Sequence, residues 1–171
     1  CEVSDTSTQR VSGPMGRARK LELRDVTRVG GGAVRYGGRR GAQRQGDVEI
    51  RERYEEVPPI NLNRELLEWA VENLLSNALT AMDKRPCVIE VAVERRAETE
   101  EVEISVTDNG RGMTREEQGR AFEPGYTTKR RGWGLVLALA RRVVDEYHAR
   151  RIGMRHRAQG QGTVMVIRFP T

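Results

Sequence analysis

The chain has 171 residues, of which 37% are hydrophobic and 5% aromatic, and its net charge at pH 7 is +5. This length predicts one domain with a modest core, and no apolar run approaches the roughly 18 residues that a membrane-spanning helix needs. The two cysteines, Cys1 and Cys87, are too few for a disulfide framework or a structural zinc site, which favours a reducing cytoplasm.

The surplus positive charge lies in the N-terminal quarter of the chain. Residues 1–46 carry a net charge of +6, whereas residues 47–171 carry −1. No aromatic residues are interleaved with a basic stripe, as base-stacking surfaces require. We therefore expect no nucleic-acid partner.

The first 60 residues show only short signals. Residues 1–20 are polar and aperiodic, which is typical of a tail or the remnant of a preceding element. Alternation at 21–26 predicts a short strand, and the glycine-rich stretch 30–41 predicts a loop. A second strand, at a sheet edge, is expected from Val48 towards Pro58.

The remaining pattern is clearer. A helix is expected from a cap at Asn61 or Asn63 to about Met82, followed by a hairpin of strands at 87–94 and 102–106. A glycine-rich segment then leads into a helix at 135–147 and two strands at 152–157 and 164–169. Helices alternating with antiparallel hairpins predict an α+β fold, a two-layer sandwich in which helices cover one face of a mixed, mainly antiparallel sheet.

Two asparagines within an otherwise apolar helix are the first candidates for chemistry. Asn73 and Asn77 are four residues apart and share one helix face, which Thr80 continues. Amide oxygens in such a row can bind a hard cation such as Mg²⁺. A pair of solvated amides is the alternative interpretation.

Two glycine-containing segments follow. Asp108, at a strand end, begins the run Asp-Asn-Gly-Arg-Gly-Met, and its carboxylate could accept a hydrogen bond from an exocyclic amine. Gly132-Trp133-Gly134 opens the next helix, where free N–H groups favour an anion, and Lys129, Arg130 and Arg131 add positive charge. Taken singly, the Asp108 segment favours a plain turn, and Gly132-Trp133-Gly134 is weak evidence that a glycine-rich helix cap would also explain.

In combination and order, these motifs resemble the Bergerat-fold (GHKL) ATPase superfamily, and within it the sensor histidine kinases. The likeness covers about residues 48–170. Its parts are an asparagine box at 72–82, glycine boxes at 108–113 and 132–137, a phenylalanine box at 122–129 and a final Gly-x-Gly-Thr at 160–163.

The resemblance implies a role for each motif in binding ATP and Mg²⁺. Asn77 would hold Mg²⁺ with support from Asn73, and Asp108 would accept a hydrogen bond from the adenine amino group. Residues 114–131 would form a lid, and Asn73, Asn77 and Lys129 would be catalytic. The further nucleotide contacts implied are Gly110, Gly112, Met113, Arg130, Arg131, Gly132, Gly134, Leu135 and Thr163.

The resemblance also implies a two-component kinase whose catalytic domain spans residues 21–171. The γ-phosphate would pass to a histidine on a dimerisation domain absent from this chain, of which residues 1–20 could be a remnant, and then to a response regulator. The parent protein is expected to be a homodimer, possibly membrane-anchored, with no direct membrane contact from this chain. Related hydrolases have a glutamate where this chain has Asn73, which favours transfer.

Three alternatives stay open at this point. The chain could be a Bergerat-type hydrolase or a serine kinase of the anti-sigma class. It could also be a nucleotide-binding module with impaired catalysis, because Val136 stands where the family usually has a small residue.

Overall fold

The computed structural model describes residues 19–21, 48–58, 60–83, 85–127, 134–148, 151–155, 157 and 159–171. The predicted loop at 30–41 lies outside these residues. The strands are β1 (Arg19–Leu21), β2 (Val48–Tyr54), β3 (Ile60–Leu62), β4 (Cys87–Arg96), β5 (Glu101–Asp108), β6 (Arg151–Arg155) and β7 (Val164–Pro170). The helices are α2 (Arg64–Ala81), α3 (Arg115–Arg120) and α4 (Val136–His148).

A five-stranded sheet in the order β2-β4-β5-β7-β6 forms the centre of the fold. β2 runs parallel to β4, and every other neighbouring pair is antiparallel. The predicted hairpin is the β4–β5 pair, and the strand expected at an edge is β2. The predicted mixed, mainly antiparallel sheet is therefore confirmed.

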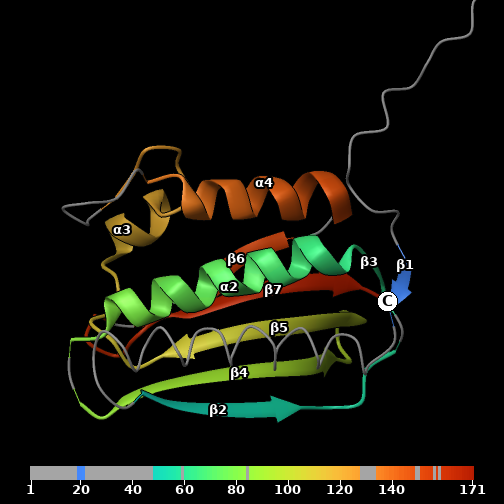
Figure 1. Ribbon diagram of the computed structural model, residues 1–171, viewed down its shortest axis with the longest axis horizontal. Helices are drawn as coiled ribbons and strands as arrows, with labels where there is room; N and C mark the ends of the chain where they lie inside the picture. The colour runs from blue at the N-terminus through green and yellow to red at the C-terminus, as the bar shows by residue number, and fades with distance from the viewer. Residues whose placement is uncertain are drawn as a thin grey trace, which may run out of the picture.

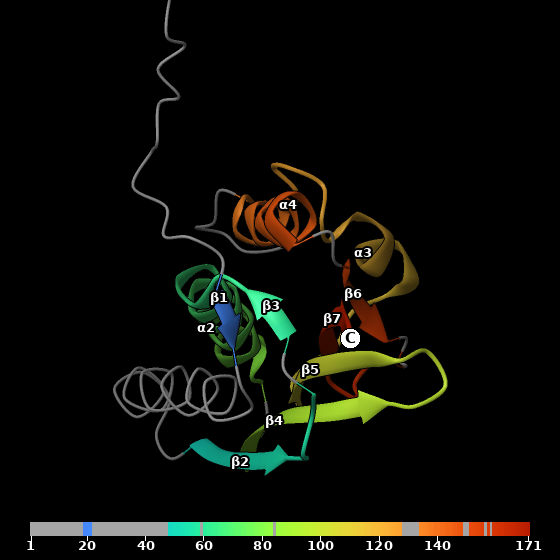
Figure 2. The same cartoon turned by 90° about the vertical axis from the view of Figure 1, so that its right-hand side faces the viewer.

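The helices α2 and α4 lie on the same face of this sheet (Figures 1 and 2). α2 buries Leu67, Val71 and Leu74 at helical spacing against the strands, whose inward side chains include Ile89, Ile104 and Ile167. α4 adds Ala140 and Val144 to the same core. The expected two-layer α+β sandwich is thus present. No helix in the described part of the chain is long and apolar enough to cross a membrane.

The start of α2 is fixed by Asn63. Its side-chain oxygen accepts a hydrogen bond from the backbone N–H of Leu66 at 3.2 Å, which satisfies one of the donors left free in the first turn. Asn61, the other expected cap, belongs to β3 instead. The helix ends at Ala81, one residue before the predicted end.

A second, two-stranded sheet joins β1 to β3 in antiparallel register, with Arg19 opposite Leu62. β1 begins at Arg19 rather than at the expected Leu21. The prediction that Arg19 and Lys20 belong to an N-terminal tail was therefore wrong, because both lie in this strand. Residues 22–26 of the expected strand lie outside the described residues. β3 was not predicted, because three residues before a helix cap are too few to show the alternation of apolar and polar side chains that marks a strand.

Candidate nucleotide-binding site

Asp108 lies at the end of β5, and its carboxylate is buried. One oxygen, Oδ1, accepts hydrogen bonds from the backbone N–H groups of Gly110, at 2.8 Å, and Thr163, at 3.2 Å. Oδ2 accepts none from the described residues. One oxygen therefore closes the turn, and the other is left as an acceptor for a ligand.

Thr163 stands beside this carboxylate. Its backbone carbonyl accepts a hydrogen bond from the N–H of Asp108 at 2.9 Å, and its side chain is buried. The hydroxyl Oγ1 has no hydrogen-bond partner among the described residues. An unsatisfied buried hydroxyl costs about 1–3 kcal/mol, so a ligand that bonds to it would recover that energy.

Burial raises the pKa of Asp108 above its ordinary value of 3.8. Desolvation is the largest cause of this shift; the hydrogen bonds from Gly110 and Thr163 and the charge of Arg157 lower the pKa, whereas the charge of Asp83 raises it. Desolvation disfavours the charged form of the carboxyl group, and a hydrogen-bond donor brought to Oδ2 by a ligand would stabilise that charged form. The carboxylate is thus suited to a neutral ligand group that donates a hydrogen bond.

Glycines allow the backbone to pack closely around Asp108. A Cβ on Gly110 would collide with the carbonyl group of Ala81, and one on Gly162 would collide with the carbonyl group of Asp108. Gly162 also has φ +78°, a conformation that residues with a Cβ adopt at a cost. The close backbone packing therefore requires glycine at the predicted contact Gly110 and at Gly162 of the Gly-x-Gly-Thr motif.

The last turn of α2 adjoins this glycine turn. The N–H of Arg111 donates to the carbonyl oxygen of Ala81 at 3.1 Å. Asn77 precedes Ala81 by one helical turn, and Asn73 precedes Asn77 by another, so both lie on the helix that reaches the Asp108 turn. Both side chains are half-buried.

Two polar side chains of α2, Asn73 and Thr80, hydrogen-bond to the backbone of their own helix. Nδ2 of Asn73 donates to the carbonyl oxygen of Trp69 at 2.8 Å, which leaves its amide oxygen as the end available to a ligand. The hydroxyl of Thr80 donates to the carbonyl oxygens of Ser76 and Asn77. Thr80 was expected to continue the row of polar groups, but its hydroxyl is directed at the backbone of α2.

The predicted lid contains α3. Thr114 caps this helix in a capping box with Glu117, a Thr-x-x-Glu pattern that sequence reasoning overlooked. Nε2 of Gln118 donates to the carbonyl oxygens of Met113, at 3.0 Å, and Arg157, at 3.2 Å. The predicted site residue Met113 is thus tied to the lid and to the loop between β6 and β7.

The described part of the lid returns to the start of α4. The N–H of Gly125 donates to the carbonyl oxygen of Gly134 at 3.0 Å, and Gly134 has φ +65°. Val136, the first residue of α4, is 49% exposed, and Leu135 just before it is 40% exposed. The predicted contacts Lys129, Arg130, Arg131 and Gly132 lie outside the described residues.

Comparison with known proteins matches residues 62–171 to the family described as "Histidine kinase-, DNA gyrase B-, and HSP90-like ATPase". The chain belongs to this ATPase family. Among its relatives are the signal transduction histidine-protein kinase AtoS of Escherichia coli (strain K12), 37% identical over 92 residues, and sporulation kinase E of Bacillus subtilis (strain 168), 34% identical over 116 residues. The predicted resemblance to sensor histidine kinases is confirmed.

These relatives are much longer than the chain. The matched regions cover 54% of the chain for AtoS and 68% for sporulation kinase E, but 15% of each relative. The chain therefore matches only a small part of the length of each relative.

Solved structures share the fold. The catalytic domain of histidine kinase ThkA has a TM-score of 0.72 and 21% identity, covering 91% of this chain and 96% of that one. Full-length ShkA has a TM-score of 0.76 and 20% identity, covering 91% of this chain and 32% of that one. The fold expected for this ATPase family is confirmed.

Proposed function

We propose that this chain is the ATP-binding catalytic domain of a sensor histidine kinase, which transfers the γ-phosphate of ATP to a histidine on a separate dimerisation domain. The observation that carries the proposal is the pairing of Asp108 with Thr163. The carboxylate and the hydroxyl are both buried and stand together, and among the described residues neither Oδ2 of Asp108 nor Oγ1 of Thr163 has a hydrogen-bond partner.

This pairing supports the adenine end of the proposed site. Oδ2 of Asp108 would accept a hydrogen bond from the adenine amino group, and the hydroxyl of Thr163 would bond to the same base. The absence of side chains at Gly110 and Gly162, where the backbone packs closely, would help a planar ring to reach both groups. The relative ShkA was solved with the ATP analogue AMPPNP, which is consistent with this assignment.

The asparagine face of α2 supports the metal end. Asn77 would supply an amide oxygen to Mg²⁺, and Asn73, anchored through Nδ2 to Trp69, would turn its own oxygen to the same side. Mg²⁺ is usually held by few protein ligands together with phosphate oxygens, which suits a helix that offers amides alone. The metal, when bound, would neutralise charge on the phosphates during transfer.

The rest of the nucleotide would run towards the start of α4. Gly134 and Leu135, together with Gly132, Lys129, Arg130 and Arg131, are the proposed phosphate contacts, and Met113 joins them at the adenine side. Residues 114–131 would close over the ATP. Gly125, within this lid, donates a hydrogen bond to Gly134, one of the proposed phosphate contacts. This bond supports a lid that is attached at the phosphate end of the site.

Transfer is favoured over hydrolysis because of position 73. Related hydrolases activate water with a carboxylate there, whereas Asn73 is neutral and its amide is engaged with Trp69. Phosphoryl transfer relies on positioning and charge neutralisation more than on a base. The proposed partners are accordingly a histidine-bearing dimerisation domain and a response regulator, in a homodimeric parent protein.

Calorimetry with Mg²⁺ and AMPPNP tests the adenine contact. The Asp108→Asn variant is expected to lose binding, because its amide would keep an oxygen at the Gly110 and Thr163 N–H groups and turn its NH2 towards the adenine amine. Asp145→Asn, at an exposed ion pair with Arg141 on α4, is the matched control and should bind as the unchanged chain does. Equal affinity for both variants would contradict the proposed site.

Phosphotransfer is tested on the full-length parent protein with labelled ATP. An acid-labile, alkali-stable protein phosphate is expected, and Asn77→Ala should abolish it. Steady release of free phosphate without protein labelling would favour the hydrolase alternative, and an acid-stable product would favour the serine kinase. Val136→Gly addresses the impaired module, since a gain in nucleotide affinity would identify Val136 as an obstruction.

A further inference from the structure

A buried carboxylate lies on the face of the sheet opposite α2 and α4. Glu103 is the third residue of β5 and is only 1% exposed. Its neighbours Val102 and Ile104 point into the helix-covered core, so alternation along the strand directs Glu103 to the other side. A charge this deeply buried requires partners of opposite charge.

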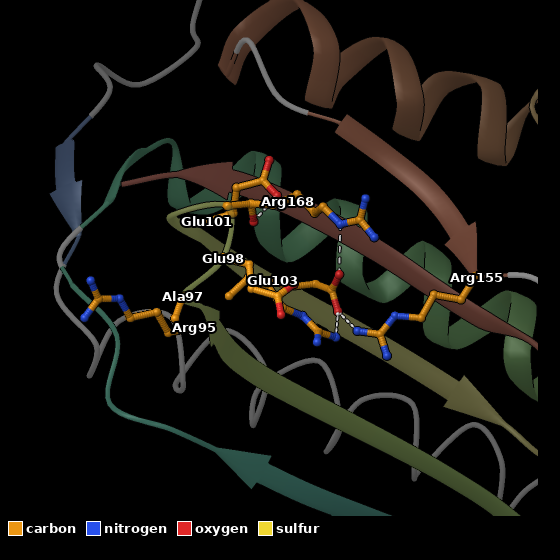
Figure 3. Close-up of a pocket in the computed structure, with 9 residues that line it drawn as sticks. Arg95, Ala97, Glu98, Glu101, Glu103, Arg155 and Arg168 are labelled. Atoms are coloured by element: carbon orange, nitrogen blue, oxygen red, sulfur yellow. Dashed lines mark hydrogen bonds and ion pairs between the residues drawn. The ribbon is translucent and has the colours of Figure 1, made fainter.

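Three arginines from three other strands supply those partners (Figure 3). Oε1 of Glu103 accepts hydrogen bonds from Arg96 of β4, at 2.9 Å, and from Arg155 of β6. Oε2 accepts one from Arg168 of β7 at 2.9 Å. A single carboxylate therefore fixes three guanidinium groups side by side.

Positive charge is left over in this cluster, which we call the Glu103 cluster and define as Glu103, Arg96, Arg155 and Arg168. The nearest further carboxylate, Glu94, lies 3.3 Å from Arg96 and 4.0 Å from Arg155, but it is also paired with Arg53. On the far side, the residue of β6 opposite Arg168 is another cation, Arg151. Each cation of the cluster remains about 40% exposed.

A hollow of about 610 Å³ opens above the Glu103 cluster. Two acidic residues, Glu98 and Glu101, also line it, but Figure 3 shows them on the side away from Arg155. The Glu101 carboxylate accepts a hydrogen bond from the hydroxyl of Thr99 at 2.9 Å. Arg95 lies on that side as well, so acidic and basic side chains are mixed there, whereas the end at Arg155 and Arg168, the cationic end, has arginines gathered around Glu103.

We propose that the cationic end of this hollow binds a small oxyanion, a phosphate or carboxylate group. Each guanidinium has five N–H donors, and Glu103 engages one nitrogen of each in the recorded bonds. Arginine forks match planar or tetrahedral oxyanions, and the buried carboxylate holds the forks in place before the ligand arrives.

This site is separate from the proposed nucleotide pocket. Glu103 and Asp108 belong to one strand but are five residues apart, so their side chains lie on opposite faces of the sheet. The oxyanion would therefore bind without displacing ATP. The inference does not depend on the proposed kinase function.

The test is an NMR titration of the 171-residue chain that follows the arginine Nε–H signals. Inorganic phosphate is the ligand in one arm and succinate in the other, at ionic strength held constant with chloride. Saturable shifts at Arg155 and Arg168 are expected, and the arm with the tighter binding identifies the preferred oxyanion. Shifts at Gly110 or Gly162 without saturable shifts at Arg155 and Arg168 would mean that the anion binds in the nucleotide pocket, which would contradict the proposal.

Single substitutions locate the binding. Arg155→Gln and Arg168→Gln should each weaken it about tenfold by removing charge-assisted hydrogen bonds. Arg51→Gln is the matched control, because Arg51 is an exposed strand arginine already paired with Glu49 and does not line the hollow.

Two results would overturn the proposal. One is the absence of saturable shifts at Arg155 and Arg168 in both arms. The other is binding that Arg155→Gln, Arg168→Gln and Arg51→Gln weaken equally. In either case the Glu103 cluster is only an ion-pair network that stabilises the sheet.

Discussion

Asp108 and Thr163 are 55 residues apart in the chain, yet each donates its backbone N–H to the other. Asp108 N–H reaches the carbonyl oxygen of Thr163 at 2.9 Å, and Thr163 N–H reaches Oδ1 of Asp108 at 3.2 Å. This exchange joins the end of β5 to the start of β7. The two side chains proposed to bind adenine therefore have a fixed relative position without any ligand.

Removing the hydroxyl of Thr163 should change stability and affinity in opposite directions. Thr163→Val replaces an unpartnered buried hydroxyl with a methyl group, so the free energy of unfolding of the nucleotide-free chain should rise by about 1 kcal/mol. The affinity for Mg²⁺-AMPPNP should fall about tenfold, because a hydrogen bond to adenine is lost. Urea unfolding and calorimetry measure the two effects.

Thr107→Val is the control for this substitution. Thr107 lies one residue before Asp108 on β5, on the other face of the sheet. Its replacement should change neither quantity by more than about 0.5 kcal/mol. A Thr163→Val variant with unchanged nucleotide affinity would mean that the hydroxyl does not contact the base.

The raised pKa of Asp108 predicts a pH dependence of stability. Between 3.8 and the higher folded-state pKa, the folded chain binds more protons at Asp108 than the unfolded chain does. The contribution of Asp108 to the free energy of unfolding must therefore fall as pH rises through this interval, and stay constant above it.

Comparison with Asp108→Asn isolates that contribution, because asparagine does not titrate. Unfolding in urea should be measured for both proteins from about pH 4 to about pH 7. Relative to the unchanged chain, the variant should become more stable as pH rises above 3.8, until the pH passes the folded-state pKa of Asp108 and the difference becomes constant. A constant difference across the range would show that burial does not shift the carboxyl group.

The sequence indicated candidate residues through their order along the chain. A polar turn after a strongly alternating strand singled out Asp108, and amides within an apolar helix singled out Asn73 and Asn77, but their proposed roles come from the resemblance of the ordered motifs to the family. α3 was missed although Thr114 and Glu117 carry a capping signature, since six residues are too few for helical periodicity. The Glu103 cluster could not be foreseen, because strand order β4-β5-β7-β6 alone brings its arginines together.

Substitutions at two glycines in one loop can distinguish the cost of backbone strain from the cost of a steric collision. Gly160 and Gly162 both have positive φ, +84° and +78°, but a Cβ on Gly160 meets nothing within 4 Å, whereas one on Gly162 overlaps the carbonyl group of Asp108. Gly160→Ala should cost about 1–2 kcal/mol of stability. Gly162→Ala should cost at least about 2 kcal/mol more and weaken nucleotide binding. Equal losses in urea unfolding would contradict the close approach.

The lid is coupled to the adenine side of the site through Gln118. Its Nε2 donates to the carbonyl oxygens of Met113 and Arg157, and Arg157 in turn donates to the carbonyl oxygen of Gln161. Gln118→Ala removes both bonds, so α3 should separate more readily from the loop between β6 and β7. Two neutral hydrogen bonds correspond to about 1–3 kcal/mol, or roughly tenfold to a hundredfold in the opening equilibrium.

Hydrogen exchange at the backbone amides of α3 measures this opening. Exchange at Gln118, Gly119 and Arg120 should speed up in Gln118→Ala, while the core strands β4 and β5 keep their protection. Gly119→Ala is the matched control, because a Cβ there meets nothing within 4 Å and alanine favours the helix, so exchange in α3 should slow. Faster exchange in β4 and β5 as well would mean that Gln118 supports the whole fold and not the lid alone.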